Sequence, residues 1–292
     1  MEKSKFLWNA FGKLRNADDL KEYMYGREYG HTNYYHYTSL KNINSILKDK
    51  RMWISCVNGF NDEIDKRQFG TEDRQKEFYS ICFSTGVNEN LPLWYLYSGI
   101  HGKGGRISFT KNTINDLINN IAVYKLYEFK DNELSETSDM TLEDGVTMKL
   151  SFKDVLYYHE DVSELKLKYN TMTNYSIAVD ELEKIKEIMK YCMKGLIWYY
   201  EKETRLIIQL IGDAKKLIND NPEKHYKVVL DFNDNIKKRM KIDLSPEVTD
   251  INEILKYEAI KDKLIESSNV QFSTYKGEIK MKICDNCSYK NK

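Results

Sequence analysis

Short apolar runs alternate along the chain with stretches in which apolar residues recur every three or four positions. The runs have the length of buried strands, and the recurring positions are those of one helix face. Strands are predicted at residues 33–37, 51–57, 78–85, 104–110, 123–129, 155–161, 203–211 and 225–232, with a final pair within 270–283. Helices are predicted from residue 40 onward and at 62–77, 91–99, 111–121, 163–196 and 247–266.

Segments of both kinds are mixed along the chain, which is typical of an α+β protein. The chain contains only three prolines, and no low-complexity linker divides it. We therefore expect a single α+β domain over residues 31–292, with a central mixed β-sheet flanked by helices. A polar, helical N-terminal arm over residues 1–30 precedes it.

Charge and hydropathy narrow the class of protein. Apolar residues make up 41% of the 292 positions, which is enough for a sizeable core. Lys+Arg and Asp+Glu both number 45, so no overall basic excess favours binding to nucleic-acid phosphates. The N-terminus has no long apolar run, and no stretch has membrane-spanning length. These features favour a cytoplasmic protein without a membrane partner.

Five cysteines fit such a protein, and three of them, Cys56, Cys82 and Cys192, have apolar surroundings in the sequence. Cys284 and Cys287 form a C-x-x-C pair near the C-terminus. Zinc needs two more ligands, and no second such pair occurs. We therefore expect no metal site and a free thiol pair.

His36 and Tyr37 lie at the end of the first predicted strand, directly before a helix cap. A histidine there is either hydrogen-bonded within the core or part of a binding site at the strand end. Acidic residues gather at the next turn, where Asp62, Glu63 and Asp65 suit the start of a helix for backbone reasons. A divalent-metal site at these three residues is the weaker interpretation.

Ser84 and Thr85 end an apolar strand, and Trp94 and Tyr97 follow on a short predicted helix. Hydroxyl groups at such a strand end often contact a ligand, and the two aromatic residues, three apart, share a helix face. Trp94 and Tyr97 either close the core or line a ligand cleft. These four residues are candidates for binding a cofactor.

Glu201, Glu203 and Arg205 lie at or just before the start of a strand rich in β-branched residues. In extended chain, residues two apart point the same way, so the three charges should share one side. Burying them is costly unless they are paired or used. The alternatives are an ion pair at the end of a sheet and a functional site.

These clusters, in this order, resemble a widespread bacterial family known as domain of unknown function 2971. The resemblance rests on "HYTSLKNINSILKDKRMWIS", "FND", "CFS", "LWYLYS", "GGRISF" and "W-Y-x-E-x-E-x-R", which together span residues 34 to about 211. A more remote resemblance is to ADP-ribosyltransferases, because His36, Phe83-Ser84-Thr85, Tyr97 and Glu201-x-Glu203 follow the order of that fold's motifs. This second resemblance implies that the central sheet could be split.

The resemblance to ADP-ribosyltransferases implies NAD as the substrate and a bacterial toxin or anti-phage effector as the biological setting. It implies that Glu203 stabilises the ribosyl cation and that Glu201 orients or activates a protein or nucleic-acid acceptor. His36 would bind the adenosine ribose, and Tyr97 or Trp94 would stack on nicotinamide. Tyr37, Ser84, Thr85 and Arg205 complete the expected cofactor-binding residues.

Two other classes of function remain open from the sequence. One is a non-catalytic module that binds a nucleotide or a partner, because clefts rich in aromatic residues also suit recognition without chemistry. The other is a metal-dependent nuclease that uses His36, Asp62 and Glu203. The neutral overall charge and the lack of a metal motif count against the nuclease.

Overall fold

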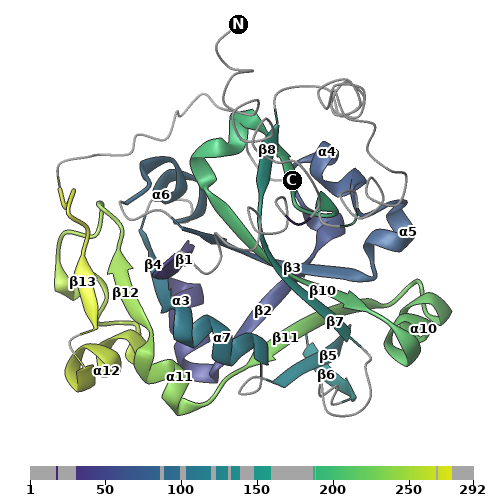
Figure 1. Cartoon of the computed structure of the whole chain (residues 1–292). Helices are drawn as coiled ribbons and strands as arrows, with labels where there is room; N and C mark the ends of the chain where they lie inside the picture. The colour runs from purple at the N-terminus through teal and green to yellow at the C-terminus, as the bar shows by residue number, and fades with distance from the viewer. Residues whose placement is uncertain are drawn as a thin grey trace, which may run out of the picture. The chain divides into compact units, whose positions relative to one another are not determined.

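The computed structural model divides the chain into two compact units, each built from separate stretches of sequence. Unit 1 comprises Met1–Thr32, Trp53–Ser84 and Val123–Leu230, and unit 2 comprises Asn33–Met52, Thr85–Ala122 and Asp231–Lys292. The structure describes residues 18, 31–85, 89–98, 103–119, 123–130, 133–138, 148–158, 187, 189–267 and 269–277. Figure 1 labels the elements.

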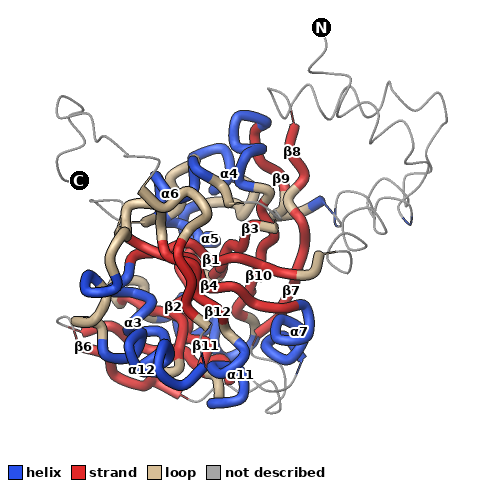
Figure 2. The backbone as a smooth tube through the Cα atoms, turned by 90° about the vertical axis from the view of Figure 1, so that its left-hand side faces the viewer, coloured by secondary structure: helices blue, strands red, loops and turns tan. Residues whose placement is uncertain are grey.

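The strands of unit 1 form a row with β10 between β3 and β7 (Figures 1 and 2). Both neighbours are antiparallel to β10, with Glu203 opposite Ser84 in β3 and Thr204 opposite Asp154 in β7. The row runs β7(Met148–Asp154), β10(Glu203–Leu210), β3(Phe78–Ser84), β2(Arg51–Cys56), β11(His225–Asp231), β5(Val123–Lys130) and β6(Glu133–Ser138). Seven of the eight residues of β10 are buried, so this strand is central to the unit.

Short elements complete unit 1. The strands β8(Leu156–Tyr158) and β9(Met193–Gly195) form a separate parallel pair. The helices are α4(Glu63–Arg67), α5(Glu72–Gln75) and α10(Gly212–Asp220), with 3-10 turns η1(Val57–Gly59) and η2(Leu196–Glu201). The Asp62 side chain caps α4 by accepting from the amides of Ile64 and Asp65, as expected for an acidic residue at a helix start.

Unit 2 contains a second row of strands, ordered β13(Val270–Phe272), β12(Lys241–Leu244), β4(Gly104–Thr110) and β1(Asn33–Ser39). The β1/β4 and β4/β12 pairs are antiparallel, whereas β12 and β13 are parallel. The helices are α3(Leu40–Asp49), α6(Leu91–Tyr97), α7(Lys111–Asn119), α11(Asp234–Arg239) and α12(Glu258–Ser267), with the 3-10 turn η3(Ile251–Glu253).

Local sequence signals explain the helix ends of unit 2. Ser39 caps α3, since its hydroxyl accepts from the amide of Asn42 at 3.2 Å. The apolar positions that predict this helix are all buried: Leu40, Ile43, Ile46 and Leu47. Asn90 caps α6 by accepting from the amide of Leu93 at 3.3 Å, and a proline occupies its first turn. Figure 1 shows α12 beside β13, and the amide of Ala259 in α12 donates to Asn44 of α3.

The structure confirms the predicted α+β class and a mixed sheet with helices. The strand at 104–110 has the predicted bounds, and six other strands agree within about two residues at each end. The proposed arm lies outside the described residues apart from Asp18, as do Cys284 and Cys287. The division into an arm and one domain stays a prediction. None of the described helices is long and apolar enough to cross a membrane.

Three predicted helices are wrong in extent. The helix at 62–77 is two short helices, because Gly70 between them has a φ of 101°, a conformation outside the helical region. The helix at 163–196 lies largely outside the described residues, and its predicted end is instead β9 followed by the start of η2. The single helix predicted at 247–266 is instead the 3-10 turn η3 followed by the separate helix α12. Sequence patterning also missed β6, β7, α10, α11 and β12.

Gly104 gives a test of packing in unit 2. A Cβ atom added there would lie 2.5 Å from Cα of Ser98 and 2.6 Å from the carbonyl oxygen of Thr38, both of which belong to backbone. We predict that Gly104→Ala lowers the free energy of unfolding by about 2 kcal/mol or more, because the backbone must move. Urea denaturation measures this change. Gly59→Ala is the matched control, since its Cβ would meet nothing within 4 Å, and an equal loss in both variants would contradict the packing argument.

Candidate functional site

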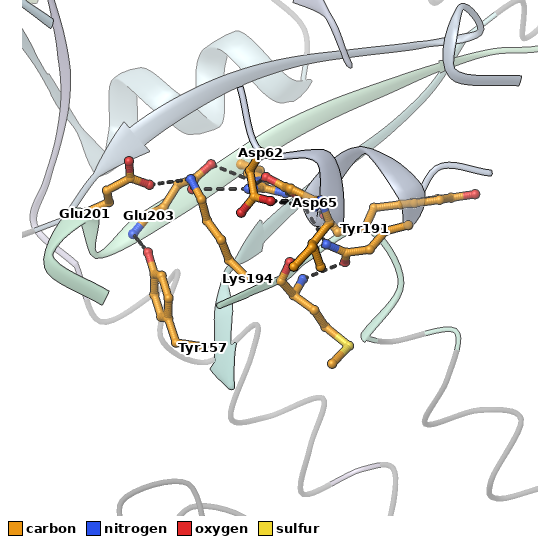
Figure 3. A network of polar contacts seen from close by, with 11 residues as sticks. Asp62, Asp65, Tyr157, Tyr191, Lys194, Glu201 and Glu203 are labelled. Carbon is orange, nitrogen blue, oxygen red and sulfur yellow. Dashed lines mark hydrogen bonds and ion pairs between the residues drawn. The ribbon is translucent and has the colours of Figure 1, made fainter. Parts of the chain in front are cut away.

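Five buried charged side chains meet around the N-terminal end of strand β10 in unit 1. They come from α4, β9, η2 and β10, and Figure 3 shows most of them as sticks. We call them the charge cluster: Asp65, Lys194, Glu201, Glu203 and Arg205. Each is exposed over less than a tenth of its surface, so the cluster is largely withdrawn from water.

Arg205 is the centre of this cluster and is fully buried, with 0% of its surface exposed. Its Nε donates to Oε1 of Glu203 at 2.6 Å, which confirms that the two side chains share one side of the strand. Its two terminal nitrogens donate to both carboxylate oxygens of Asp65 at 2.7 and 2.5 Å. Nη1 also donates to the carbonyl oxygen of Tyr191 at 3.1 Å. A guanidinium held in this way can act on a ligand only through its neighbours.

Lys194 joins the two glutamates. Its ammonium donates to Oε2 of Glu201 at 2.5 Å and to Oε2 of Glu203 at 3.1 Å (Figure 3). The predicted convergence of the two carboxylates is therefore present in the structure. The predicted extended backbone at Glu201 is wrong, because Glu201 ends η2 and Lys202 adopts a left-handed conformation with φ 44° before β10 begins.

Two of the three described non-glycine residues with positive φ lie beside this cluster. They are Lys202, between the glutamates, and Tyr191, with φ 69°, whose carbonyl oxygen faces Arg205. Side chains rarely adopt this conformation, which costs of order 1 kcal/mol or more at each residue and persists only where surrounding contacts impose it. Outliers of this kind gather at functional sites and in strongly constrained networks.

The charges of the cluster do not cancel. Three carboxylates face two cations, so one negative charge is in excess when all five groups are ionised. Burial would raise the pKa of Glu203, but Arg205 and Lys194 outweigh burial and hold that pKa well below its ordinary value. Burial raises the pKa of Asp65, although Arg205 opposes this change. Burial would lower the pKa of Lys194, but Glu203 and Glu201 raise it above its ordinary value. Glu203 therefore stays ionised.

Polar contacts fix the elements that carry these charges. The hydroxyl of Tyr157 in β8 accepts from the amide of Glu203 at 2.8 Å. Gln68, just after α4, donates to Asp65 at 3.1 Å and to the carbonyl oxygen of Met193, and it accepts from the amide of Met193 at 2.9 Å. These bonds connect α4 to β9 and set the distance between Asp65 and Lys194.

In unit 2, Tyr37 belongs to a separate buried network. Its hydroxyl accepts from Nη1 of Arg106 at 2.9 Å and from the amide of Asn90 at 3.2 Å. Its ring meets Trp94 edge to face, with centroids 4.7 Å apart. Burial raises the pKa of the Tyr37 hydroxyl, although Arg106 opposes the change. His36 precedes it at intermediate burial and lies opposite Ile107 in β4.

The two aromatic candidates of α6 differ in exposure. Trp94 is fully buried and its indole donates to Glu89 at 3.1 Å, whereas Tyr97 is 42% exposed. Trp94 therefore belongs to the core of unit 2 in this conformation, which was one of the two interpretations of the sequence. Tyr97 retains a ring surface that a ligand can reach.

The predicted site residues are divided between the two units. Unit 1 holds Glu201, Glu203, Arg205 and Ser84, with Ser84 opposite Glu203 in the β3/β10 pair. Unit 2 holds His36, Tyr37, Thr85, Trp94 and Tyr97. Within unit 1, Ser84 lies opposite Glu203 in the strand pair, and Glu203 shares Lys194 with Glu201.

Sequence reasoning missed two members of the charge cluster. Lys194 fell inside a predicted long helix, where a lysine is unremarkable, and Asp65 was interpreted as an acidic residue at a helix start or, as the weaker interpretation, as a metal ligand. In the described part of the chain, no group of three or more His, Cys, Asp or Glu residues could hold a metal ion. Arg205 occupies the space between Asp65 and Glu203, and its positive charge would repel a cation there.

No protein-family model and no curated protein match the chain, so the resemblance to domain of unknown function 2971 stays a prediction. Among solved structures, DarT from Thermus sp. 2.9 in complex with carba-NAD+ is similar, at 9% sequence identity and a TM-score of 0.30. The match covers 84% of this chain and 96% of that one.

Lys194 gives a test of how the cluster is balanced. We predict that Lys194→Met lowers the free energy of unfolding by about 3–5 kcal/mol, because it leaves Glu201 and Glu203 buried without their shared cation. Lys190→Met is the control, since Lys190 makes a surface ion pair with Glu187 at 3.1 Å and should cost less than about 1 kcal/mol. Chemical denaturation at neutral pH compares the two. Similar losses would mean that Lys194 is not balancing buried charge.

Glu203 gives a test of pH dependence. Because its folded pKa is below its ordinary value of 4.5, its ionised form stabilises the protein above that pH, and this contribution is lost as the pH falls toward the folded pKa. We predict that wild type loses stability below about pH 4.5 and that Glu203→Gln loses less over the same range. Thermal unfolding at several pH values measures both slopes. Parallel slopes for the two proteins would contradict the lowered pKa.

Proposed function

We propose that the protein is an NAD-consuming enzyme of the ADP-ribosyltransferase type, with Glu203 as its central catalytic residue. The observation that carries this proposal is the convergence of Glu201 and Glu203 on one lysine, with Glu203 held ionised. Two carboxylates that are fixed at one strand end and kept in different surroundings suit a reaction that develops positive charge.

Cleavage of the bond between nicotinamide and ribose builds positive charge on the ribose, as in the oxocarbenium-like state of glycoside cleavage. An ionised Glu203 stabilises that charge without first losing a proton. Water then gives NAD hydrolysis, and an acceptor gives ADP-ribosyl transfer.

The other residues of unit 1 have supporting roles in this mechanism. Glu201 shares Lys194 with Glu203 and orients or activates the acceptor. Arg205 is a positioning residue, since it is fully buried and acts through its hydrogen bonds to Glu203 and Asp65. Ser84 shapes the ribose side of the site, because the β3/β10 pair places it opposite Glu203.

The resemblance to ADP-ribosyltransferases assigns nucleotide binding to residues that lie in unit 2, and these roles are kept as part of the proposal. His36 hydrogen-bonds the adenosine ribose, and the half-exposed ring of Tyr97 stacks on nicotinamide. The roles of Thr85 and Tyr37 in nucleotide binding stay predictions, and the Tyr37 hydroxyl is already bonded to Arg106 and to the amide of Asn90. Trp94 supports α6 from within the core rather than touching the ligand. A toxin or an anti-phage effector is the setting that the resemblance to bacterial families supports.

A second candidate is a non-catalytic module that binds a nucleotide. The observation that favours it is that both carboxylate oxygens of Glu203 already accept hydrogen bonds from Arg205, and one also accepts from Lys194. A glutamate occupied in this way can be purely structural. In that case NAD binds without release of nicotinamide.

We predict that the protein releases nicotinamide from NAD and that Glu203→Gln reduces the rate about 100-fold or more, because the neutral amide cannot stabilise the ribosyl cation. Chromatography of the reaction mixture measures nicotinamide. Glu77→Gln is the matched control, since Glu77 is another buried glutamate paired with a lysine, Lys215 at 3.0 Å, and it precedes β3 at the opposite end of the β3/β10 pair from Glu203.

Calorimetric titration with NAD and thermal unfolding of each variant accompany this assay. Binding without turnover in the wild type would favour the non-catalytic module. Absence of both binding and turnover, or full activity in Glu203→Gln, would remove the enzyme proposal. If Glu203→Gln does not fold, Glu201→Gln carries the test, since Glu201 makes one described ion pair, to Lys194.

A further inference from the structure

Glu89 in unit 2 joins two segments that lie far apart in the sequence. Its Oε1 accepts from the amide and the hydroxyl of Thr274 at 2.7 and 2.9 Å. Its Oε2 accepts from the indole nitrogen of Trp94 at 3.1 Å and from the hydroxyl of Ser273. A carboxylate has about four acceptor positions, so this one is fully used.

The donors belong to two elements. Trp94 lies in α6, whose N-terminal cap, Asn90, directly follows Glu89. Ser273 and Thr274 begin the turn after β13, in which the amide of Tyr275 donates to the Ser273 hydroxyl and the amide of Gly277 donates to Pro246. Gly277 has a φ of 73°, which glycine adopts without strain, so this turn has a defined backbone.

A second route connects the same two regions. Gln271 of β13 donates to Oδ1 of Asp243 at 2.5 Å, and Arg106 donates to Oδ2 of Asp243 at 2.6 Å. Arg106 also donates to the hydroxyl of Tyr37, whose ring packs against Trp94. Both routes therefore run from residues 271–274 to Trp94. The first passes through one carboxylate and the second through three side chains.

We propose that Glu89 is a positioning residue that latches α6 to the turn after β13, so that residues 89–98 and 270–277 open together as one local unit. Both segments are short, since α6 has seven residues and β13 three. β13 also pairs with β12, and Trp94 of α6 packs against Tyr37, so the bonds of Glu89 add to these contacts and are a direct polar link between the two segments. Local opening of such units needs less than global unfolding and leaves the remaining strands paired. The β1/β4 pair, with its seven paired residues, stays closed when the latch opens.

The latch has a consequence for ligand binding that rests on the proposed function. Tyr97 lies on α6, one turn after Trp94, and its position depends on how α6 is held. Opening of the latch would move the ring that stacks on nicotinamide and weaken NAD binding. The latch itself is a property of unit 2 and requires no turnover.

Amide hydrogen exchange on the full chain, followed by mass spectrometry, tests the latch. In Glu89→Gln an amide nitrogen, which cannot accept a hydrogen bond, replaces one carboxylate oxygen of Glu89. Each oxygen accepts from two donors, so two of the four hydrogen bonds are lost. Exchange should become about tenfold faster in peptides from both 89–98 and 270–277, with no change in 104–110. Thr274→Val, which removes one hydroxyl donor and keeps the shape, should give a smaller change in the same two segments.

Glu258→Gln is the control, because Glu258 is an exposed glutamate of unit 2 in the first turn of α12. Three results would overturn the latch. They are faster exchange in one of the two segments only, an equal acceleration in 104–110 as well, and no change in any segment. If Glu89→Gln does not fold, Thr274→Val alone decides. These outcomes are independent of NAD turnover, so failure of the proposed function is distinguishable from failure of the latch.

Discussion

Charged side chains that are buried away from water have to be paired within the protein. Unit 1 buries five of them around the N-terminal end of strand β10. Arg205 is the most constrained of them, since it has no exposed surface and donates to Asp65, Glu203 and the Tyr191 carbonyl. Removing the carboxylate of Asp65 or of Glu203 would leave the buried guanidinium of Arg205 incompletely compensated. The positions of α4, β9 and η2 around β10 follow from this requirement.

The same requirement connects the structure to the proposed chemistry. Left-handed backbone at Tyr191 and Lys202 is unfavourable by itself and is held by the cluster contacts. The result is a pair of glutamates fixed on one lysine, with Glu203 kept ionised. Preorganised charge of this kind is what the stabilisation of a developing cation needs, because no reorganisation is required at the moment of reaction.

The pattern of apolar residues predicted those helices and strands in which apolar residues recur at one regular spacing over several residues. The strand at 104–110 and the buried positions of α3 follow directly from apolar spacing and a serine cap. The side-by-side placement of Glu203 and Arg205 follows from the two-residue repeat of a strand. Lys194 and Asp65 could not be predicted in this way, because pairing between β9, α4 and β10 is a tertiary contact without a local signal. The polar sequences of β6 and β7 lack the apolar run that marks a buried strand.

The central claim is that the folded protein holds Glu203 ionised, and the carboxylate itself can report this. Carbon-13 NMR of a glutamate-labelled sample, with the Glu203 signal assigned by its loss in Glu203→Gln, would follow protonation directly. The account predicts that this signal keeps its ionised chemical shift through the pH range in which exposed glutamates become protonated. Titration of Glu203 at or above its ordinary value of 4.5 would contradict the account.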